Sequence, residues 1–336
     1  MSHPPRTPAR TPICTTTRNR PRLRPAGLAL AVVALATLLA GAPARAEKLT
    51  VLLDWFLNPD HASLVVAEQK GFFAEAGLEV EMIEPADPND PPKLVAAGKA
   101  DLAVSYQPQL HIQAAQGLPL ARVGTLIATP LNTLLALDDG PVRTIADLEG
   151  RRIGYSVGGF EDALLSAMLA KHGLALSDVE LVNVNFSLSP ALLSGQVDAV
   201  IGAFRNFELN QLAIEGHTGR PFYVEEEGVP AYDELILVAH RERLEDPRID
   251  AFLGAVERAV QYLINHPEEG WALFIRHDKE LDDELNRRAF ADTLPRFALR
   301  PRALDRARYD RFAAFLRAQG VIDAIPPSQS YAVEVR

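Results

Sequence analysis

Two segments of this chain follow the same plan and lie 97 residues apart, measured from Gly98 to Gly195. In each segment, residues 94–104 and 192–202, a helical stretch ends at the glycine, and an aspartate three residues later opens an apolar strand. Glycine suits the position after a helix because it adopts the left-handed backbone conformation without steric cost. The duplication predicts two similarly built α/β lobes, which is the fold class that we expect.

The regions before and after these segments fit this fold class. Residues 49–53 form a short apolar run typical of a buried strand, residues 62–70 have helical spacing, and residues 77–82 alternate like a second strand. A strand, helix and strand at this spacing predict a right-handed parallel unit. Further on, apolar side chains recur at helical intervals from Ile249 to Leu263, and we assign this helical tail to the first lobe.

Two turn-prone breaks suggest where the chain crosses between the lobes. One is the polar stretch at residues 138–141, and the other lies at residues 228–233. We therefore expect residues 47–137 together with 236–336 to form lobe 1 and residues 138–235 to form lobe 2. Two lobes joined by two crossings would leave a ligand cleft between them.

The first 46 residues differ from the rest. They carry seven arginines and no acidic residue, then an apolar run at residues 27–39 and an Ala-Arg-Ala sequence at residues 44–46. This order is typical of a cleavable secretory signal peptide. The apolar run is shorter than the roughly 20 residues of a membrane span, and Cys14 precedes it, so that a lipid-anchored N-terminus is not indicated. We expect a mature chain that is soluble in the periplasm, with a membrane anchor as the alternative.

Charge and cysteine content exclude several functions. The chain has 34 Lys and Arg against 44 Asp and Glu, and without the seven signal arginines the balance is 27 against 44, a formal charge of −17. Such a surface repels nucleic-acid phosphates. With Cys14 removed, the mature chain has no disulfide and no cysteine nucleophile, and neither a metal-ligand spacing nor a Gly-x-Ser-x-Gly turn occurs. We expect a binding protein without metal, cofactor or catalytic residues.

Ligands in open parallel sheets bind beyond the carboxyl ends of the strands. This rule selects polar and aromatic side chains that follow the predicted strands. The candidate ligand-binding residues are Asp54, Trp55, Asn58, His61, Tyr106, Gln107, Tyr155, Gly158, Gly159, Phe160, Glu161, Asn185, Arg205, Asn206 and Glu208.

Several of these residues allow two interpretations. Trp55 and Tyr106 could offer ring faces for stacking or could pack the turns that carry them. The glycine turn before Glu161 could aim backbone N–H groups at an anion, or Glu161 could simply favour the start of a helix. His61 could be a general base or a hydrogen-bonded structural residue. Glu208 could accept hydrogen bonds from an amino-substituted heterocycle or could pair with a cation such as Arg205.

Three motifs carry a resemblance to a known family. They are Leu-Asp-Trp-Phe-Leu-Asn-Pro-Asp-His at residues 53–61, Ser-Tyr-Gln-Pro at residues 105–108 and Gly-Gly-Phe-Glu at residues 158–161. With them, the chain resembles the periplasmic binding proteins of ABC transporters for thiamine pyrimidine precursors, which are related to the pyrimidine synthase of thiamine biosynthesis. The resemblance covers essentially the whole mature chain, although the general two-lobed pattern also fits binders of nitrate, taurine and alkanesulfonates.

The resemblance implies a type II periplasmic binding protein fold, with two Rossmann-like lobes that close on an aminopyrimidine such as the formylated aminomethyl derivative. It also implies an ABC transporter permease as partner, and we expect a monomer. From the matching motifs, Trp55 would stack on or line the ring of the ligand. The polar edge of that ring would meet Asn58, Tyr106, the turn at residues 158–161 and Glu208.

Two alternatives remain open at this point. His61 matches a functional histidine of the synthase, which would make the chain an enzyme, but the cysteine-rich motif of that branch is absent and the corresponding residues 229–234 are ordinary. A riboflavin-type ligand could use the same aromatic walls, whereas a sulfonate or nitrate ligand would require a pocket that binds anions. The resemblance therefore favours uptake over synthesis.

Overall fold

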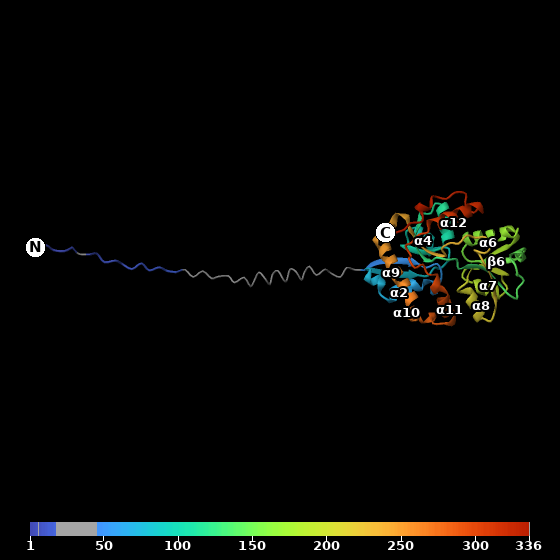
Figure 1. Ribbon diagram of the computed structural model, residues 1–336, viewed down its shortest axis with the longest axis horizontal. Coiled ribbons are helices and arrows are strands. Elements are labelled where there is room, and N and C mark those ends of the chain that lie inside the picture. The colour runs from blue at the N-terminus through green and yellow to red at the C-terminus, as the bar shows by residue number, and fades with distance from the viewer. Residues whose placement is uncertain (6, 18–45, 336) are drawn as a thin grey trace. The chain divides into compact units, whose positions relative to one another are not determined.

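The structure is a computed structural model that describes residues 1–5, 7–17 and 46–335 (Figure 1). Residues from Ala46 onward form one compact unit, distinct from residues 1–45. The expected apolar run at residues 27–39 lies outside the described residues, as does most of the expected cleavage site. Within the described ranges, no helix combines the length and the apolar character that crossing a membrane requires.

The first sheet has five strands in the order β2-β1-β3-β10-β4. Strand β1 pairs in parallel with β2 and β3, whereas β10 pairs antiparallel with β3 and β4. The parallel pair of β1 and β2 matches the predicted strand, helix and strand unit. The bounds are β1 (Glu47–Leu52), β2 (Leu78–Ile83), β3 (Leu102–Ser105), β4 (Leu120–Ile127) and β10 (Leu235–His240).

The second sheet repeats this arrangement in the order β7-β6-β8-β5-β9. Strand β6 pairs in parallel with β7 and β8, and β5 pairs antiparallel with β8 and β9. Each sheet with its helices is called a lobe below, lobe 1 for the first sheet and lobe 2 for the second. The bounds are β5 (Asn132–Leu137), β6 (Arg152–Tyr155), β7 (Glu180–Asn183), β8 (Ala199–Phe204) and β9 (Gly219–Tyr223).

The two duplicated segments occupy equivalent places in the two sheets. They form α4 (Pro91–Ala96) with β3, and α7 (Leu188–Leu193) with β8. The aspartates of the two segments make equivalent contacts. An Asp101 oxygen accepts from Thr50 N in β1 at 2.9 Å, and an Asp198 oxygen accepts from Arg152 N in β6 at 3.0 Å. Each carboxylate therefore completes the hydrogen bonding of the strand beside it.

The first crossing between the sheets differs from the expected one. Residues 132–137 were expected in lobe 1, but they form β5, which pairs with β8 and β9 of lobe 2. The chain thus crosses at residues 128–131, between β4 and β5, and the polar break after Leu137 is a turn inside lobe 2. An apolar run gives no sign of which sheet it joins, and this explains the wrong boundary. The return crossing lies between β9 and β10.

Helices of the tail pack mainly on lobe 1 (Figure 1). In α9, the buried residues include Ile249, Phe252, Val256 and Leu263, as the helical spacing predicted, and α9 packs against α2 and α3. One tail helix, α11, also contacts α8 of lobe 2. The bounds are α2 (Ala62–Gln69), α3 (Phe72–Glu75), α5 (Gln107–Ala115), α6 (Phe160–Lys171), α8 (Glu208–Ile214), α9 (Pro247–Asn265), α10 (Pro267–His277), α11 (Glu284–Thr293) and α12 (Arg306–Ala318).

Candidate functional site

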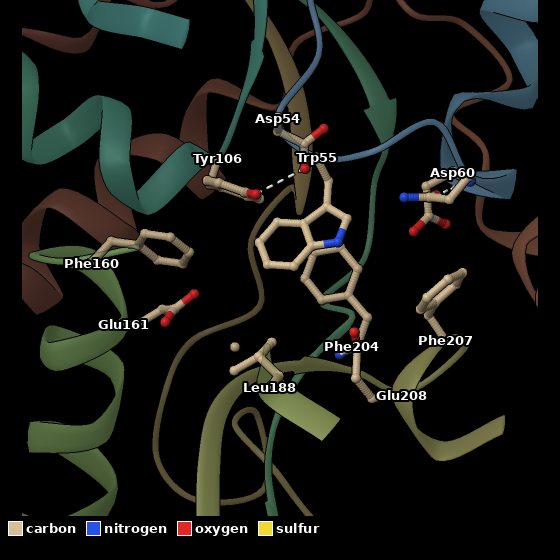
Figure 2. Close-up of a pocket in the computed structure, with 12 residues that line it drawn as sticks. Asp54, Trp55, Asp60, Tyr106, Phe160, Glu161, Leu188, Phe204, Phe207 and Glu208 are labelled. Atoms are coloured by element: carbon tan, nitrogen blue, oxygen red, sulfur yellow. Dashed lines mark hydrogen bonds between the residues drawn. The ribbon is translucent and has the colours of Figure 1, made fainter. Parts of the chain in front are cut away.

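A pocket lies between the two lobes and encloses about 470 Å³ that no atom fills, part of it open to solvent (Figure 2). Lobe 1 contributes the turn after β1 and the residue after β3, and lobe 2 contributes the start of α6, a residue of α7 and the end of β8. The lining residues are Asp54, Trp55, Asn58, Asp60, Tyr106, Phe160, Glu161, Leu188, Gly202, Phe204, Phe207 and Glu208.

A buried hydrogen-bond chain orders the lobe 1 wall. The Tyr106 hydroxyl donates to Asp54 Oδ2 at 2.8 Å, and Asp54 Oδ1 lies 2.9 Å from His61 Nε2. Because His61 Nδ1 accepts from Asn58 N at 3.3 Å, the proton of a neutral ring sits on Nε2 and points at Asp54. His61 is fully buried and outside the lining set, and both ring nitrogens are engaged, so the structure supports its structural interpretation.

The Asn-Pro turn fixes the same wall locally. Asn58 Oδ1 accepts from Asp60 N at 2.8 Å, which caps the short 3₁₀ helix η1 (Pro59–His61), and its side-chain amide donates to Phe56 O at 3.0 Å. Asn58 lines the pocket, yet both ends of its amide hold the turn. The turn in consequence presents Trp55 and Asp60 to the pocket in a fixed arrangement.

Aromatic rings from both lobes meet around the pocket. The Tyr106 and Phe160 rings stack across the lobes, with centroids 4.7 Å apart and planes inclined by 24°. Figure 2 shows the Trp55 indole extending into the pocket in front of Phe204. Phe186 of lobe 2 meets Trp55 edge-on at a centroid distance of 4.7 Å. Such walls suit a flat, apolar ring.

Four carboxyl groups line the same pocket, those of Asp54, Asp60, Glu161 and Glu208, and burial raises the pKa of the last three. Burial raises the pKa of Asp60 to about 6, against the opposing effects of His61 and the hydrogen bonds from Thr293 and Asn206. Burial likewise raises the pKa of Glu208 to about 7, and it raises the pKa of Glu161 well above its usual range. These groups can therefore carry a proton near neutral pH, which lets a carboxyl donate as well as accept a hydrogen bond.

Some predicted residues support the pocket without lining it. Asn206 donates from Nδ2 to Asp60 Oδ1 and to Thr293 Oγ1, both at 2.7 Å, and thereby ties lobe 2 and α11 to the lobe 1 turn. Gln107 Oε1 accepts from Asp233 N at 2.8 Å in the return crossing. The structure thus gives Asn206 and Gln107 positioning roles.

Other predicted residues are engaged elsewhere. Arg205 forms two bonds to the Glu225 carboxylate, at 2.7 and 2.8 Å, so it does not pair with Glu208. Asn185 adopts a left-handed backbone conformation, and its carbonyl oxygen accepts from the Ser156 hydroxyl. Tyr155, Gly158 and Gly159 also stand outside the lining set.

Five lining residues were not predicted from the sequence, namely Asp60, Leu188, Gly202, Phe204 and Phe207. Leu188 and Gly202 have neither a polar nor an aromatic side chain, and Phe204 and Phe207 were passed over in favour of the polar residues next to them. Asp60 lies inside the motif at residues 53–61, but its neighbour Pro59 suggested only a turn. The positive φ of Gly202, +99°, marks a special position that no sequence pattern signalled. No group of three potential metal ligands exists in the described ranges.

The fold belongs to a known class. The alkanesulfonate-binding protein of Xanthomonas axonopodis pv. citri, solved with bound MOPS, matches with a TM-score of 0.65 over 88% of this chain and 98% of that chain, at 21% identity. Two mixed sheets with a pocket between them and this similarity define the chain as a protein with the periplasmic binding protein fold. The expected fold class is thereby confirmed.

Sequence similarity identifies the family. Residues 58–270 match the family described as NMT1/THI5 like, and the chain belongs to it. A Haemophilus influenzae protein named for thiamine biosynthesis is 57% identical over 86% of this chain and 92% of that protein. A formylaminopyrimidine-binding protein of Halalkalibacterium halodurans is 34% identical over 70% of this chain and 72% of that protein. A 4-amino-5-hydroxymethyl-2-methylpyrimidine phosphate synthase of Legionella pneumophila is 27% identical over 82% of this chain and 88% of that protein.

Proposed function

We propose that this chain binds a thiamine-related aminopyrimidine of the formylaminopyrimidine type in the periplasm and delivers it to an ABC transporter permease. The observation that carries the proposal is the pocket itself, in which aromatic rings flank four buried carboxyl groups. The name of the Halalkalibacterium halodurans relative supports the ligand, and the binding-protein fold supports delivery to a permease.

The chemistry of the walls fits an aminopyrimidine. A flat heteroaromatic ring gains from contact with Trp55, Tyr106 and Phe160, whose faces and edges line the pocket. Its amino group donates hydrogen bonds, and its ring nitrogens accept them. A carboxyl with a pKa of about 7, as in Glu208, can accept from the amino group when ionised and donate to a ring nitrogen when protonated. The proposed ligand therefore satisfies both kinds of polar group in the pocket.

Titration calorimetry on the mature chain tests the proposal. Formylaminopyrimidine, hydroxymethylpyrimidine, riboflavin and taurine form the panel, and we expect saturable heat with at least one pyrimidine. Trp55→Ala is the site variant, and Trp271→Phe is the matched control because Trp271 packs against Phe274 and Phe290, outside the pocket. Absence of heat with both pyrimidines would refute the proposed ligand. Preferential binding of riboflavin or taurine would establish one of the alternative ligands instead.

The synthase alternative depends on His61 and on relatives that are named synthases. Burial of His61 between Asp54 and Asn58 N gives its ring no open path to a ligand in the pocket, which favours binding over catalysis. Incubation with pyridoxal phosphate and iron, followed by detection of pyrimidine product, tests the alternative. Product formation that disappears in His61→Asn would overturn the proposed function.

A further inference from the structure

The turn that leads into α6 presents backbone N–H groups of the kind that bind anions, but those of residues 156–159 already have partners. Ser156 N donates to Glu161 Oε2 at 2.8 Å, and Val157 N donates to the same carboxyl group. In the glycine turn, Gly158 N donates to Asn89 Oδ1 at 3.0 Å and Gly159 N to Asp162 Oδ2 at 3.1 Å. Backbone N–H groups at a helix start are the usual binding groups for phosphate and sulfonate oxygens. Here the chain itself satisfies the N–H groups of residues 156–159, directly before α6.

The Glu161 carboxyl occupies this position because β8 leaves room for it. A Cβ atom on Gly202 would lie 2.4 Å from Glu161 Oε1 and 2.9 Å from Oε2. The positive φ of Gly202 also disfavours any other residue there. Glu161 is 3% exposed, and both Glu161 and Gly202 line the pocket. The carboxyl group is thus enclosed between the start of α6 and the strand, at the pocket wall.

The other described residues of the pocket wall provide no positive charge that would bind an anion. The described lining residues include the carboxyl groups of Asp54, Asp60, Glu161 and Glu208 and no lysine or arginine. Arg205, which lies close in sequence to Glu208, is held by both oxygens of Glu225. A phosphate or sulfonate would therefore meet a wall rich in carboxyl groups, and the N–H groups of residues 156–159 are already occupied.

We propose that Glu161 is a built-in substitute for an anionic ligand group and excludes phosphorylated and sulfonated compounds from the pocket. The inference rests on the proposed function and deepens it, since it restricts the ligand to an unphosphorylated heterocycle. In its ionised form Glu161 repels an oxyanion, and in its protonated form it still occupies the N–H groups of residues 156 and 157. Exclusion therefore holds in both protonation states.

The test compares hydroxymethylpyrimidine with its phosphate monoester, and adds methanesulfonate as a simple anion. Binding to the wild-type protein, Glu161→Ala and Glu161→Ser is measured by calorimetry. Asp162→Asn is the matched control, because Asp162 also caps an N–H group at the start of α6 but stands outside the lining set. Circular dichroism and thermal melting check that each variant folds.

We expect the wild-type protein to prefer the alcohol over the phosphate ester and to give no heat with methanesulfonate. Freeing two N–H groups for charged hydrogen bonds should reduce this preference by about tenfold or more in Glu161→Ala, because one such bond contributes about 1.5 to 3 kcal/mol. Glu161→Ser should behave like Glu161→Ala, because the shorter serine side chain cannot bring its hydroxyl to Ser156 N. Asp162→Asn should keep the wild-type preference.

Two results would overturn the inference. One is equal affinity of the wild-type protein for alcohol and phosphate ester, which needs no variant. The other is a folded Glu161→Ala or Glu161→Ser protein with an unchanged preference and no binding of methanesulfonate. If no pyrimidine binds to any variant, the proposed function fails, whereas the methanesulfonate measurement still decides whether Glu161 excludes anions.

Discussion

At the scale of single residues, the pocket wall depends on side chains that fix one another. Asp54 is 3% exposed and accepts from the Tyr106 hydroxyl and from His61 Nε2. A buried acceptor that loses a donor costs about 1 to 3 kcal/mol. These two donors are therefore part of the stability of the fold as well as of the shape of the pocket.

Tyr106→Phe removes one of these donors while it keeps the ring that stacks on Phe160. We expect the free energy of unfolding to fall by about 1 to 2 kcal/mol, measured by urea denaturation. Tyr223→Phe, at a half-buried residue of β9, is the control and should change it by less than about 0.5 kcal/mol. Equal effects of the two substitutions would argue against the role assigned to the hydroxyl.

The carboxyl groups of the pocket predict how stability depends on pH. Burial raises the pKa of Glu208 from 4.5 to about 7 in the folded chain, so between these values the folded protein binds more protons than the unfolded one. Stability from this group is full below pH 4.5 and is lost as pH rises towards 7. We expect ligand-free protein to become less stable from about pH 5 to about pH 8, with a weaker dependence in Glu208→Gln. Urea denaturation across this pH range measures the free energy of unfolding of the wild-type protein and of Glu208→Gln. Identical slopes of this free energy against pH would contradict the raised pKa of Glu208.

At the scale of elements, the duplicated helix and strand units could be predicted from sequence because glycine and aspartate recur at fixed spacing. The role of the aspartates could not, since Asp101 and Asp198 bind backbone groups of strands distant in sequence. The misplaced crossing has a similar cause, because pairing between β5 and β8 leaves no local signal. Within the site, polar residues at strand ends were predictable, whereas Phe204, Phe207 and Leu188 required the packing of the lobes.

Asp198→Ala tests the hydrogen bond between the Asp198 carboxylate and the backbone of β6 in lobe 2. Removing the acceptor of Arg152 N should lower the free energy of unfolding by about 1 to 2 kcal/mol, measured by urea denaturation. Asp139→Ala, at a turn residue that makes no such strand contact, is the matched control and should be close to neutral. A neutral Asp198→Ala would mean that water replaces the carboxylate without loss.

At the scale of the whole molecule, several contacts join the lobes across the pocket, in addition to the stack of Tyr106 on Phe160. Asn89 of lobe 1 binds Gly158 N and Ser156 O, Asn206 binds Asp60, and Phe186 meets both Trp55 and Phe56. The aromatic contact joins lobe 2 to Trp55, which lines the pocket. Separation of the lobes to release a ligand would require this contact to break.

Phe186→Ala should accordingly speed ligand release. An aromatic pair contributes about 0.5 to 1.5 kcal/mol beyond its buried area, so the dissociation rate should rise by up to about tenfold, with little change in association. Stopped-flow dilution measures both rates. Ile214→Ala, at an exposed residue of α8 on the same lobe, is the control. A slower association with unchanged dissociation would exclude a role of this ring in retention.

Trp55 also gives the molecule an optical readout of its own. It is half-buried between Phe186 and the pocket, whereas the second tryptophan, Trp271, is 8% exposed among Phe274 and Phe290. A ring placed against the Trp55 indole alters the polarity around one fluorophore and leaves the other as a constant background. Intrinsic emission can then report occupancy without a dye, and candidate nutrients can be ranked with unlabelled protein.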